Sequence, residues 1–503
     1  MRLRVKSAAG AVVGALLLAG CSAGSPGGVR QGSEDRAGAA RSAAPAPPAR
    51  ESAPARLSTF ALDVDTASYG YVRRTLSEGR LPAPDDVRPE EFVNSFKPGY
   101  PRPTDNGFSV TLDGARTEAD GWSLLRVGLA TRAGAGVRPP ASLTFVVDVS
   151  GSMGEPGRLD LVKESLGLLV NRLRDDDDIA LVTFSAEAET VLPMTRVGGA
   201  RERIRRVVDT LDTSSSTNVE AGVRTGYDVA VAGHREGATN RVVLLSDALA
   251  NTGDTDADGI LERIDRERRE YGITLFGVGV GSEYGDAFME RLADKGDGHT
   301  TYVSTSEQAR KVFVDQLPSH IELRARDAKA QVDFDPKTVE EFRLVGYDNR
   351  KVADEDFRDD RVDGGEIGAG HTVTALYAVR LRPGKSGRVA TATVRWLDPV
   401  TRAPHERSGS VDSAALAAPL WGAGHDSLQV SALAGYFADR LRGGRLPGAP
   451  ALPLLASRAE ALAERARSAS VRELAQAIRQ AESLGGGDGG EDEGEGSGDP
   501  YGG

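Results

Sequence analysis

Cysteine is almost absent from this sequence, and its scarcity excludes several kinds of chemistry. The 503 residues include a single cysteine, Cys21. Disulfide bonds and thiol catalysis are therefore excluded from everything that follows it. Histidine is also scarce, and the six histidines show no paired spacing of the His-Glu-x-x-His type, so the usual zinc-protease signature is missing as well.

Basic residues are fewer than acidic residues in this chain. The chain carries 62 Lys and Arg against 74 Asp and Glu, which gives a formal net charge of −12. A protein that binds nucleic acid needs a basic face to contact phosphates, so this balance argues against nucleic acid as a partner. Aromatic residues make up only 5% of the chain. We attribute that bias to a GC-rich genome more than to function.

Long hydrophobic runs are missing, apart from a short one near the start. Residues 8–20 are apolar and follow a leader with three basic residues. The run is too short for a stable spanning helix and is typical of a secretory signal. It ends in Leu18-Ala19-Gly20-Cys21, which resembles a bacterial lipobox. The segment 1–21 is therefore predicted to be a lipoprotein signal, with diacylglycerol on the Cys21 thiol. An ordinary signal peptide with an incidental cysteine is the alternative.

Lipidation at Cys21 predicts a protein that is anchored to the cell membrane on its extracytoplasmic face. Two or more acyl chains anchor a protein firmly, whereas one is marginal. Residues 22–57 are rich in Ser, Gly, Ala and Pro and cannot bury a core, so we expect a disordered tether. The tail 485–503 is acidic and Gly-rich, and we expect it to be disordered too.

Strand and helix patterns alternate from residue 142 onwards. This alternation predicts an α/β domain over 142–316, with a doubly wound, mostly parallel six-stranded sheet. A helix is expected over 158–174, where apolar residues recur on one face. The predicted strands are 143–148, 179–185, 190–193, 241–247, 272–280 and 299–303.

Oxygen-bearing side chains follow two of these predicted strands. Asp148-Val149-Ser150-Gly151-Ser152 comes directly after the apolar run 143–147, and Asp247 ends the strand 241–247. In a doubly wound sheet, ligands bind at the carboxyl ends of strands where the strand order reverses. One carboxylate and two hydroxyls in a single turn suit a hard ion such as Mg²⁺, which prefers oxygen ligands in an octahedron.

The order Asp-x-Ser-x-Ser, then Thr217, then Asp at a strand end resembles the metal-ion-dependent adhesion site (MIDAS) of von Willebrand factor type A (VWA) domains. The resemblance covers about 142–314 and includes all five positions. It implies that Ser150, Ser152 and Thr217 contact Mg²⁺, or else Mn²⁺ or Ca²⁺. It also implies that Asp148 and Asp247 act directly or through water. A Glu or Asp carboxylate from a protein partner would then complete the octahedron.

The segments on either side of this domain are predicted to be β-rich. Residues 58–141 contain a short α/β-looking part, with a strand at 60–65, followed by strands near 108–112 and 122–129. Residues 317–412 show β periodicity again, for example at 373–381. We expect these strands to pair with those before residue 142, so that the α/β domain is inserted into a β-sandwich-like domain.

The C-terminal part and the flanks add a second resemblance. Residues 413–484 are rich in Ala and Leu and are predicted to form a helical segment. Three flanking segments, at residues 60–69, 343–350 and 355–371, are similar to YfbK-like bacterial lipoproteins. The resemblance runs from about 58 to 484. That family's biochemical role is poorly defined, so it implies architecture more than activity.

Two acidic motifs allow other interpretations. Asp254-Thr255-Asp256-Ala257-Asp258-Gly259 resembles the start of an EF-hand calcium loop, but position twelve is Asp265 and no helix enters the loop. Asp63-Val64-Asp65 approximates the nucleophile motif of haloacid-dehalogenase phosphatases. Its fifth position is Ala67, and no partner lysine motif follows. A strand end with helix-capping Asp is the simpler interpretation.

Two further motifs are weaker still. Gly384-Lys385-Ser386 resembles the end of a P-loop, but strand-like segments flank it on both sides and predict a hairpin turn. His371 lies close in sequence to Glu366, where neighbouring glycines indicate a turn that holds polar residues.

The sequence as a whole predicts a binding protein rather than an enzyme. We expect divalent-metal-dependent protein–protein binding, in adhesion or envelope assembly, with no catalytic residues. Two alternatives stay open. A metal-dependent hydrolase or phosphatase would need a base or nucleophile beside the metal. A structural lipoprotein would use the metal only to stabilise its fold.

Overall fold

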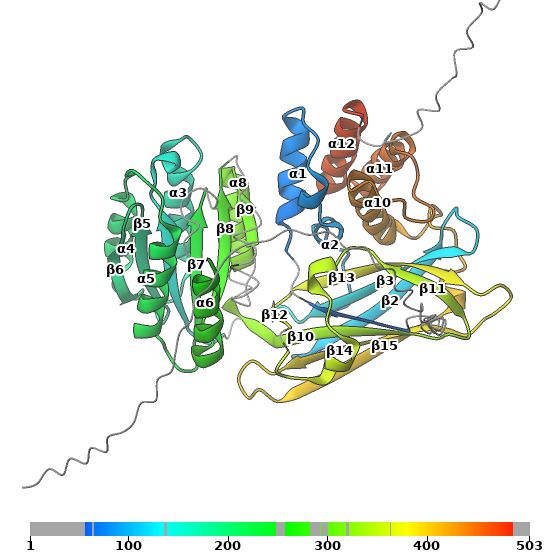
Figure 1. Cartoon of the computed structure of the whole chain (residues 1–503), viewed down its shortest axis with the longest axis horizontal. Helices are drawn as coiled ribbons and strands as arrows, with labels where there is room; N and C mark the ends of the chain where they lie inside the picture. Colours follow the sequence, from blue (N-terminus) through cyan, green and yellow to red (C-terminus); the bar gives the residue numbers. More distant parts are fainter. Residues whose placement is uncertain are drawn as a thin grey trace, which may run out of the picture. The chain divides into compact units, whose positions relative to one another are not determined.

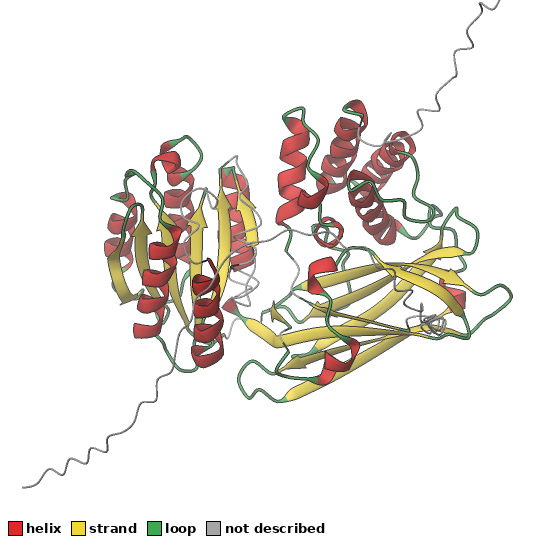
Figure 2. Cartoon of the chain, in the orientation of Figure 1, coloured by secondary structure: helices red, strands yellow, loops and turns green. Residues whose placement is uncertain are grey.

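Three sheets and several helices make up the described part of the chain (Figures 1 and 2). The structure is a computed structural model. It describes residues 56–62, 65–134, 138–247, 257–281, 292, 300–317, 321–362 and 364–485. Cys21 and the segments predicted as signal, tether and acidic tail lie outside these residues, apart from 56–57 and 485.

The first sheet has six strands in the order β6-β5-β4-β7-β8-β9. All neighbours are parallel except β6, which runs antiparallel to β5 at one edge. The sequence prediction of a mostly parallel six-stranded sheet is confirmed. The strands are β4 (Ala141–Asp148), β5 (Asp178–Phe184), β6 (Ala188–Arg196), β7 (Thr239–Ser246), β8 (Thr274–Val280) and β9 (Thr300–Val303).

Helices cover both faces of this sheet, which makes it doubly wound. Val147 of β4 packs in a cluster with residues of α3, while its neighbour Val146 packs in a second cluster with residues of α5 and α6. Successive strand side chains point to opposite faces, so a fully buried strand needs apolar residues at every position. The helices are α3 (Leu159–Arg172), α4 (Arg201–Asp209), α5 (Val219–Ala232), α6 (Ala257–Tyr271), α8 (Ser306–Arg310) and a π-helical turn η3 (Lys311–Gln316).

Two antiparallel sheets are built from strands on both sides of the α/β domain. One has the order β1-β10-β14-β15 with β12 beside β10, and the other has the order β11-β13-β3-β2. Antiparallel pairing joins β1 to β10 and β3 to β13, so early and late strands do pair, as the sequence predicted. The strands are β1 (Leu57–Ala61), β2 (Phe108–Arg116), β3 (Trp122–Thr131), β10 (Leu323–Phe334), β11 (Val339–Leu344), β12 (Gly365–Gly368), β13 (Thr372–Leu381), β14 (Arg388–Leu397) and β15 (Pro404–Asp412).

One apolar core joins the two antiparallel sheets and contains residues such as Phe108, Val127, Val332 and Val394. These residues come from β2, β3, β10 and β14, so both sheets contribute. The predicted fold class is confirmed: a doubly wound sheet inserted into a β-sandwich-like domain, followed by helices. Short helical turns lie between the longer elements: η1 (Pro84–Asp86), η2 (Gly151–Gly154), η4 (Asp348–Arg350), η5 (Asp354–Arg358) and η6 (Ser413–Leu416).

The helical segment at the C-terminal side shares its core with two early helices. Phe92 and Phe437 lie edge to face with ring centroids 6.0 Å apart, and both belong to a cluster of buried Leu, Ala and aromatic residues. No helix in the described ranges is long and apolar enough to cross a bilayer. The helices are α1 (Ala67–Ser77), α2 (Pro89–Asn94), α10 (Asp426–Leu441), α11 (Leu452–Ala466) and α12 (Ala469–Ser483).

Two local predictions are wrong. The strand expected at 60–65 ends at Ala61, and Asp65 lies in a loop where its carboxylate accepts a hydrogen bond from the backbone of Thr300 at 2.8 Å. The turn 384–386 is not a hairpin, because β13 and β14 belong to different sheets. A turn signal predicts that the chain reverses, but it does not predict which strand becomes the partner. Asp63 and Asp254 lie outside the described residues.

Candidate functional site

Asp148 is the innermost residue of the candidate site. It ends β4, is fully buried, and has both carboxylate oxygens hydrogen bonded. Oδ1 accepts from the Ser150 backbone N–H at 2.8 Å, and Oδ2 accepts from the Ser246 hydroxyl at 2.5 Å. Burial raises the pKa of Asp148 above its usual range, and these hydrogen bonds lower the pKa in part. The carboxylate is thus held by the two central strands, β4 and β7.

The two serines of the turn connect Asp148 to the second carboxylate. The hydroxyl oxygens of Ser150 and Ser152 lie 3.1 Å apart. The Ser152 hydroxyl donates to Asp247 Oδ1 at 2.9 Å. Asp247 directly follows β7 and is 5% exposed. We call the side-chain oxygens of Asp148, Ser150, Ser152 and Asp247 the oxygen cluster.

Thr217 lies on the loop between α4 and α5, which neighbours the serine turn. The Ser214 backbone N–H donates to the Val149 carbonyl at 2.7 Å, which holds this loop against the serine turn. Asn218 caps α5 by accepting from the Ala221 backbone N–H at 3.0 Å. Among the hydrogen bonds of the described residues, none joins Thr217 to the oxygen cluster. Its role as a metal ligand stays a prediction.

Arg158 is a member of the site that the sequence analysis missed. It was counted only as the first residue of a helix, whereas α3 begins at Leu159. Its guanidinium Nη1 forms an ion pair with Asp247 Oδ2 and donates to the Ser152 carbonyl at 3.0 Å. Arg158 is 5% exposed. Its position six residues after Ser152 did not by itself indicate a contact with Asp247, which is 89 residues away in the sequence.

The donor chemistry of the oxygen cluster fits a hard divalent ion. In the described ranges there is no group of three or more His, Cys, Asp or Glu side chains that could hold a metal. The cluster instead combines two carboxylates with serine hydroxyls. Mg²⁺ accepts such oxygens and retains water or ligand at its remaining positions.

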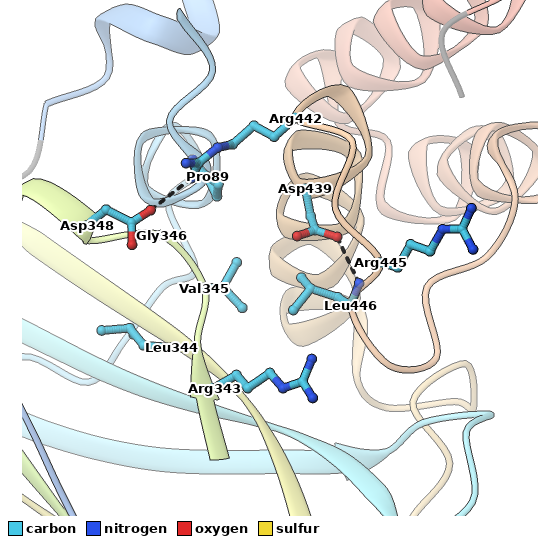
Figure 3. A pocket seen from close by; sticks show the side chains of 10 residues that line it. All are labelled: Pro89, Arg343, Leu344, Val345, Gly346, Asp348, Asp439, Arg442, Arg445 and Leu446. Atoms are coloured by element: carbon cyan, nitrogen blue, oxygen red, sulfur yellow. Dashed lines mark hydrogen bonds and ion pairs between the residues drawn. The ribbon is translucent and has the colours of Figure 1, made fainter. Parts of the chain in front are cut away.

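A cavity lies away from the oxygen cluster. It measures about 240 Å³ and lies between the end of β11 and the last turn of α10 (Figure 3). Its two acidic residues already have partners: Asp348 pairs with Arg442 at 3.0 Å, and Asp439 accepts from the Leu446 backbone N–H at 2.8 Å. None of its lining residues belongs to the oxygen cluster.

Three family models match the chain. Residues 142–315 match the von Willebrand factor type A domain, residues 320–408 match "Uncharacterized protein YfbK, C-terminal", and residues 42–123 match a model described as von Willebrand factor. The chain is 38% identical to the uncharacterized protein YfbK of Escherichia coli over 353 residues, which is 67% of this chain and 60% of that protein. The chain belongs to the YfbK-like VWA proteins.

Other relatives share mainly the VWA domain. The uncharacterized protein sll0103 of Synechocystis is 27% identical over 35% of this chain and 40% of that protein. The matches to both bacterial relatives cover less than two thirds of the relatives' own length. A solved structure, a von Willebrand factor type A protein from Catenulispora acidiphila, aligns with 73% of this chain and 89% of that one at a TM-score of 0.47 and 15% identity. VWA domains typically mediate protein–protein interaction.

Proposed function

We propose that this chain binds a protein partner through a divalent metal ion, as a lipid-anchored protein on the extracytoplasmic face of a bacterial cell membrane. Adhesion and envelope assembly are the roles that such binding would serve. The observation that carries the proposal is the Ser152 hydroxyl, which lies within hydrogen-bond distance of both the Ser150 hydroxyl and Asp247. The proposed ligands of Mg²⁺, or of Mn²⁺ or Ca²⁺, are Asp148, Ser150, Ser152, Thr217 and Asp247.

The residues of the site suit capture of a partner's Glu or Asp side chain. A bound divalent ion would supply the positive charge that attracts the partner's carboxylate. Asp148 and Asp247 are buried and are held by neighbouring groups, so their positions are fixed by the fold. Ser150 and Ser152 offer neutral oxygens, which leave more of the ion's charge uncompensated than additional carboxylates would. The proposed activity is binding without turnover.

The domain organisation is part of the proposal. We assign 142–316 to the VWA domain, 58–141 and 317–412 to the β-sandwich-like domain, and 413–484 to the helical segment. The lipid anchor would be Cys21, and the acyl chains would insert in the membrane while the folded part lies outside the cytoplasm. Labelling cells with a radioactive fatty acid tests this: the native protein incorporates label and Cys21→Ser does not.

A pull-down from solubilised cell envelope tests the metal-dependent binding. The native chain is expected to retain a partner in Mg²⁺ and to release it in EDTA, and Asp148→Ala is expected to retain none. Asp160→Ala is the matched control, because it removes an exposed carboxylate from the first turn of α3, outside the oxygen cluster. Equal retention by Asp148→Ala, or retention that EDTA does not alter, contradicts the proposal. If Asp148→Ala instead unfolds and no partner is ever metal-dependent, the metal serves only the fold.

A further inference from the structure

The ion pair between Arg158 and Asp247 places a buried positive charge inside a site proposed to bind a cation. The Arg158 and Asp247 side chains are 7% and 1% exposed, respectively. Each carboxylate oxygen of Asp247 has a partner, since Ser152 donates to Oδ1 and Arg158 pairs with Oδ2. Within the site, one guanidinium therefore offsets one of the two buried carboxylates.

The position of Arg158 is fixed by its surroundings. Its side chain lies so close to Gly281 that a Cβ at that position would be 2.8 Å from Nε. Gly281 also has a φ of +95°, in the left-handed region that favours glycine. From α1, Arg74 donates to the Gly281 carbonyl at 2.6 Å. The backbone that Arg158 packs against is thus itself fixed, and the guanidinium has little room to move away from Asp247.

The other partner of Arg158 is a weak competitor for its charge. Glu155 Oε2 lies 2.8 Å from Nη2, but the Glu155 side chain is 64% exposed. Water screens an exposed carboxylate, whereas a buried pair interacts in a lower effective dielectric. The charge of Arg158 therefore acts mainly on Asp247 and on whatever the oxygen cluster binds.

We propose that Arg158 sets the metal affinity of this site by cancelling the charge of Asp247. The inference rests on the proposed function, because it concerns the same oxygen cluster. Arg158 is a positioning residue that acts through Asp247. Its charge lowers the affinity for the bare divalent ion and leaves a bound ion more positive, and therefore more attractive to a partner's carboxylate.

Titration calorimetry with Mg²⁺ alone tests the proposal on the full-length protein. Arg158→Gln is expected to bind Mg²⁺ about tenfold more tightly than the native protein, because the buried unit charge that pairs with Asp247 is removed. Arg158→Lys keeps the charge and is expected to bind as the native protein does. Arg172→Gln is the matched control, since it removes an exposed charge from the other end of α3. A purely structural role of Arg158 predicts the opposite change, a loss of affinity in Arg158→Gln.

Mg²⁺ binding by Arg158→Gln that is unchanged or weaker than native overturns the proposal. Binding by Arg158→Lys that is as tight as binding by Arg158→Gln overturns it too, because the lysine keeps the charge. If Arg158→Gln is too unstable for calorimetry, the rise in melting temperature on adding Mg²⁺ replaces it. That rise should exceed the native one, since ligand binding stabilises the folded state according to affinity. If the native protein binds Mg²⁺ and Arg158→Gln binds it no more tightly, only this inference is contradicted. If the native protein binds no metal, the proposed function is contradicted. Tight Mg²⁺ binding by Arg158→Gln would in that case still support the role of Arg158.

Discussion

The six-stranded sheet buries aspartate at both ends of its parallel strands, which we call the amino-terminal and carboxyl-terminal edges. Guanidinium and backbone N–H donors hold aspartate at both edges, and the carboxyl-terminal edge adds serine hydroxyls. At the amino-terminal edge, Asp177 accepts from Arg138 at 2.7 and 2.5 Å and from the backbone N–H groups of Ala141 and Arg174 at 2.9 and 2.7 Å. At the carboxyl-terminal edge, Asp148 accepts from the Ser246 hydroxyl and the Ser150 backbone N–H, and Asp247 accepts from the Ser152 hydroxyl and pairs with Arg158. Asp177 and Asp148 are equally buried, at 0% exposure.

A serine hydroxyl among the donors distinguishes a carboxylate that can serve a cation from a purely structural one. Guanidinium and backbone N–H groups have hydrogens but no lone pair to offer, so they cannot turn toward a metal. A serine hydroxyl has both, and it can rotate to present its lone pairs. The amino-terminal edge, where Asp177 accepts from guanidinium and N–H groups, is therefore locked. At the carboxyl-terminal edge the serine hydroxyls can exchange their hydrogen bonds for metal ligation, while the Ser150 N–H and Arg158 stay in place. Burial alone does not distinguish the two.

The largest expected effect is at the locked edge. Asp177→Asn is expected to lower the free energy of unfolding by about 3–5 kcal/mol, because it leaves the partly buried Arg138 without its fully buried counter-charge. Urea unfolding measures this change. Asp175→Asn is the control: it removes an exposed carboxylate that pairs with Arg201 and is expected to cost less than about 1 kcal/mol. Unchanged stability in Asp177→Asn would show that the amino-terminal edge is not locked.

Asp148→Asn is expected to change metal affinity more than stability, in contrast to Asp177→Asn. It keeps the shape of the side chain and removes a charge that burial disfavours, so in EDTA we expect the free energy of unfolding to change by less than about 1 kcal/mol. Mg²⁺ affinity is expected to fall by about 100-fold, which is typical of losing a group that orients a metal site. Calorimetry and urea unfolding measure the two quantities. If Asp148→Asn loses much stability and still binds Mg²⁺, Asp148 has the same structural role as Asp177. The proposed difference between the two edges is then wrong.

The sequence predicted the sheet and all four residues of the oxygen cluster for a physical reason. Buried parallel strands need uninterrupted apolar runs, and the residue after each run must lie at one edge of the sheet. Asp148 and Asp247 are therefore brought together by the fold class alone. Ser150 and Ser152 follow from their place in the turn next to Asp148.

Arg158 and the partners of β13 could not be predicted in the same way. Arg158 reaches Asp247 across 89 residues, and no local pattern encodes a contact of that range. The sheet to which β13 belongs depends on which buried faces pack together, and two apolar strands joined by a turn are compatible with either arrangement. Thr217 is intermediate: its loop is predictable from the helix that follows, but its distance to the cluster depends on how the loop folds.

Thr217→Ala tests whether the carboxyl-terminal edge extends to the neighbouring loop. We expect Mg²⁺ affinity to fall by about tenfold, because one of several oxygen ligands is lost, while urea unfolding in EDTA stays unchanged. Ser215→Ala is the control, since it removes an exposed hydroxyl two residues away. Equal affinities of the two variants would restrict the metal site to the four residues of the oxygen cluster.

The smallest effect is expected at the cap that holds this loop. Asn218→Ala removes the side chain that accepts from the Ala221 backbone N–H, and loss of such a cap costs about 1 kcal/mol of stability. The Asn218 backbone also donates to the Ser185 carbonyl at 2.7 Å, and this bond survives the substitution. Thr217 should therefore keep its place, and Mg²⁺ affinity should fall by less than about threefold. Asn218→Asp retains the cap and should match the native protein in both urea unfolding and calorimetry. If Asn218→Ala loses as much affinity as Thr217→Ala, the side-chain cap positions the loop, and the carboxyl-terminal edge is less firmly built than its backbone hydrogen bonds indicate.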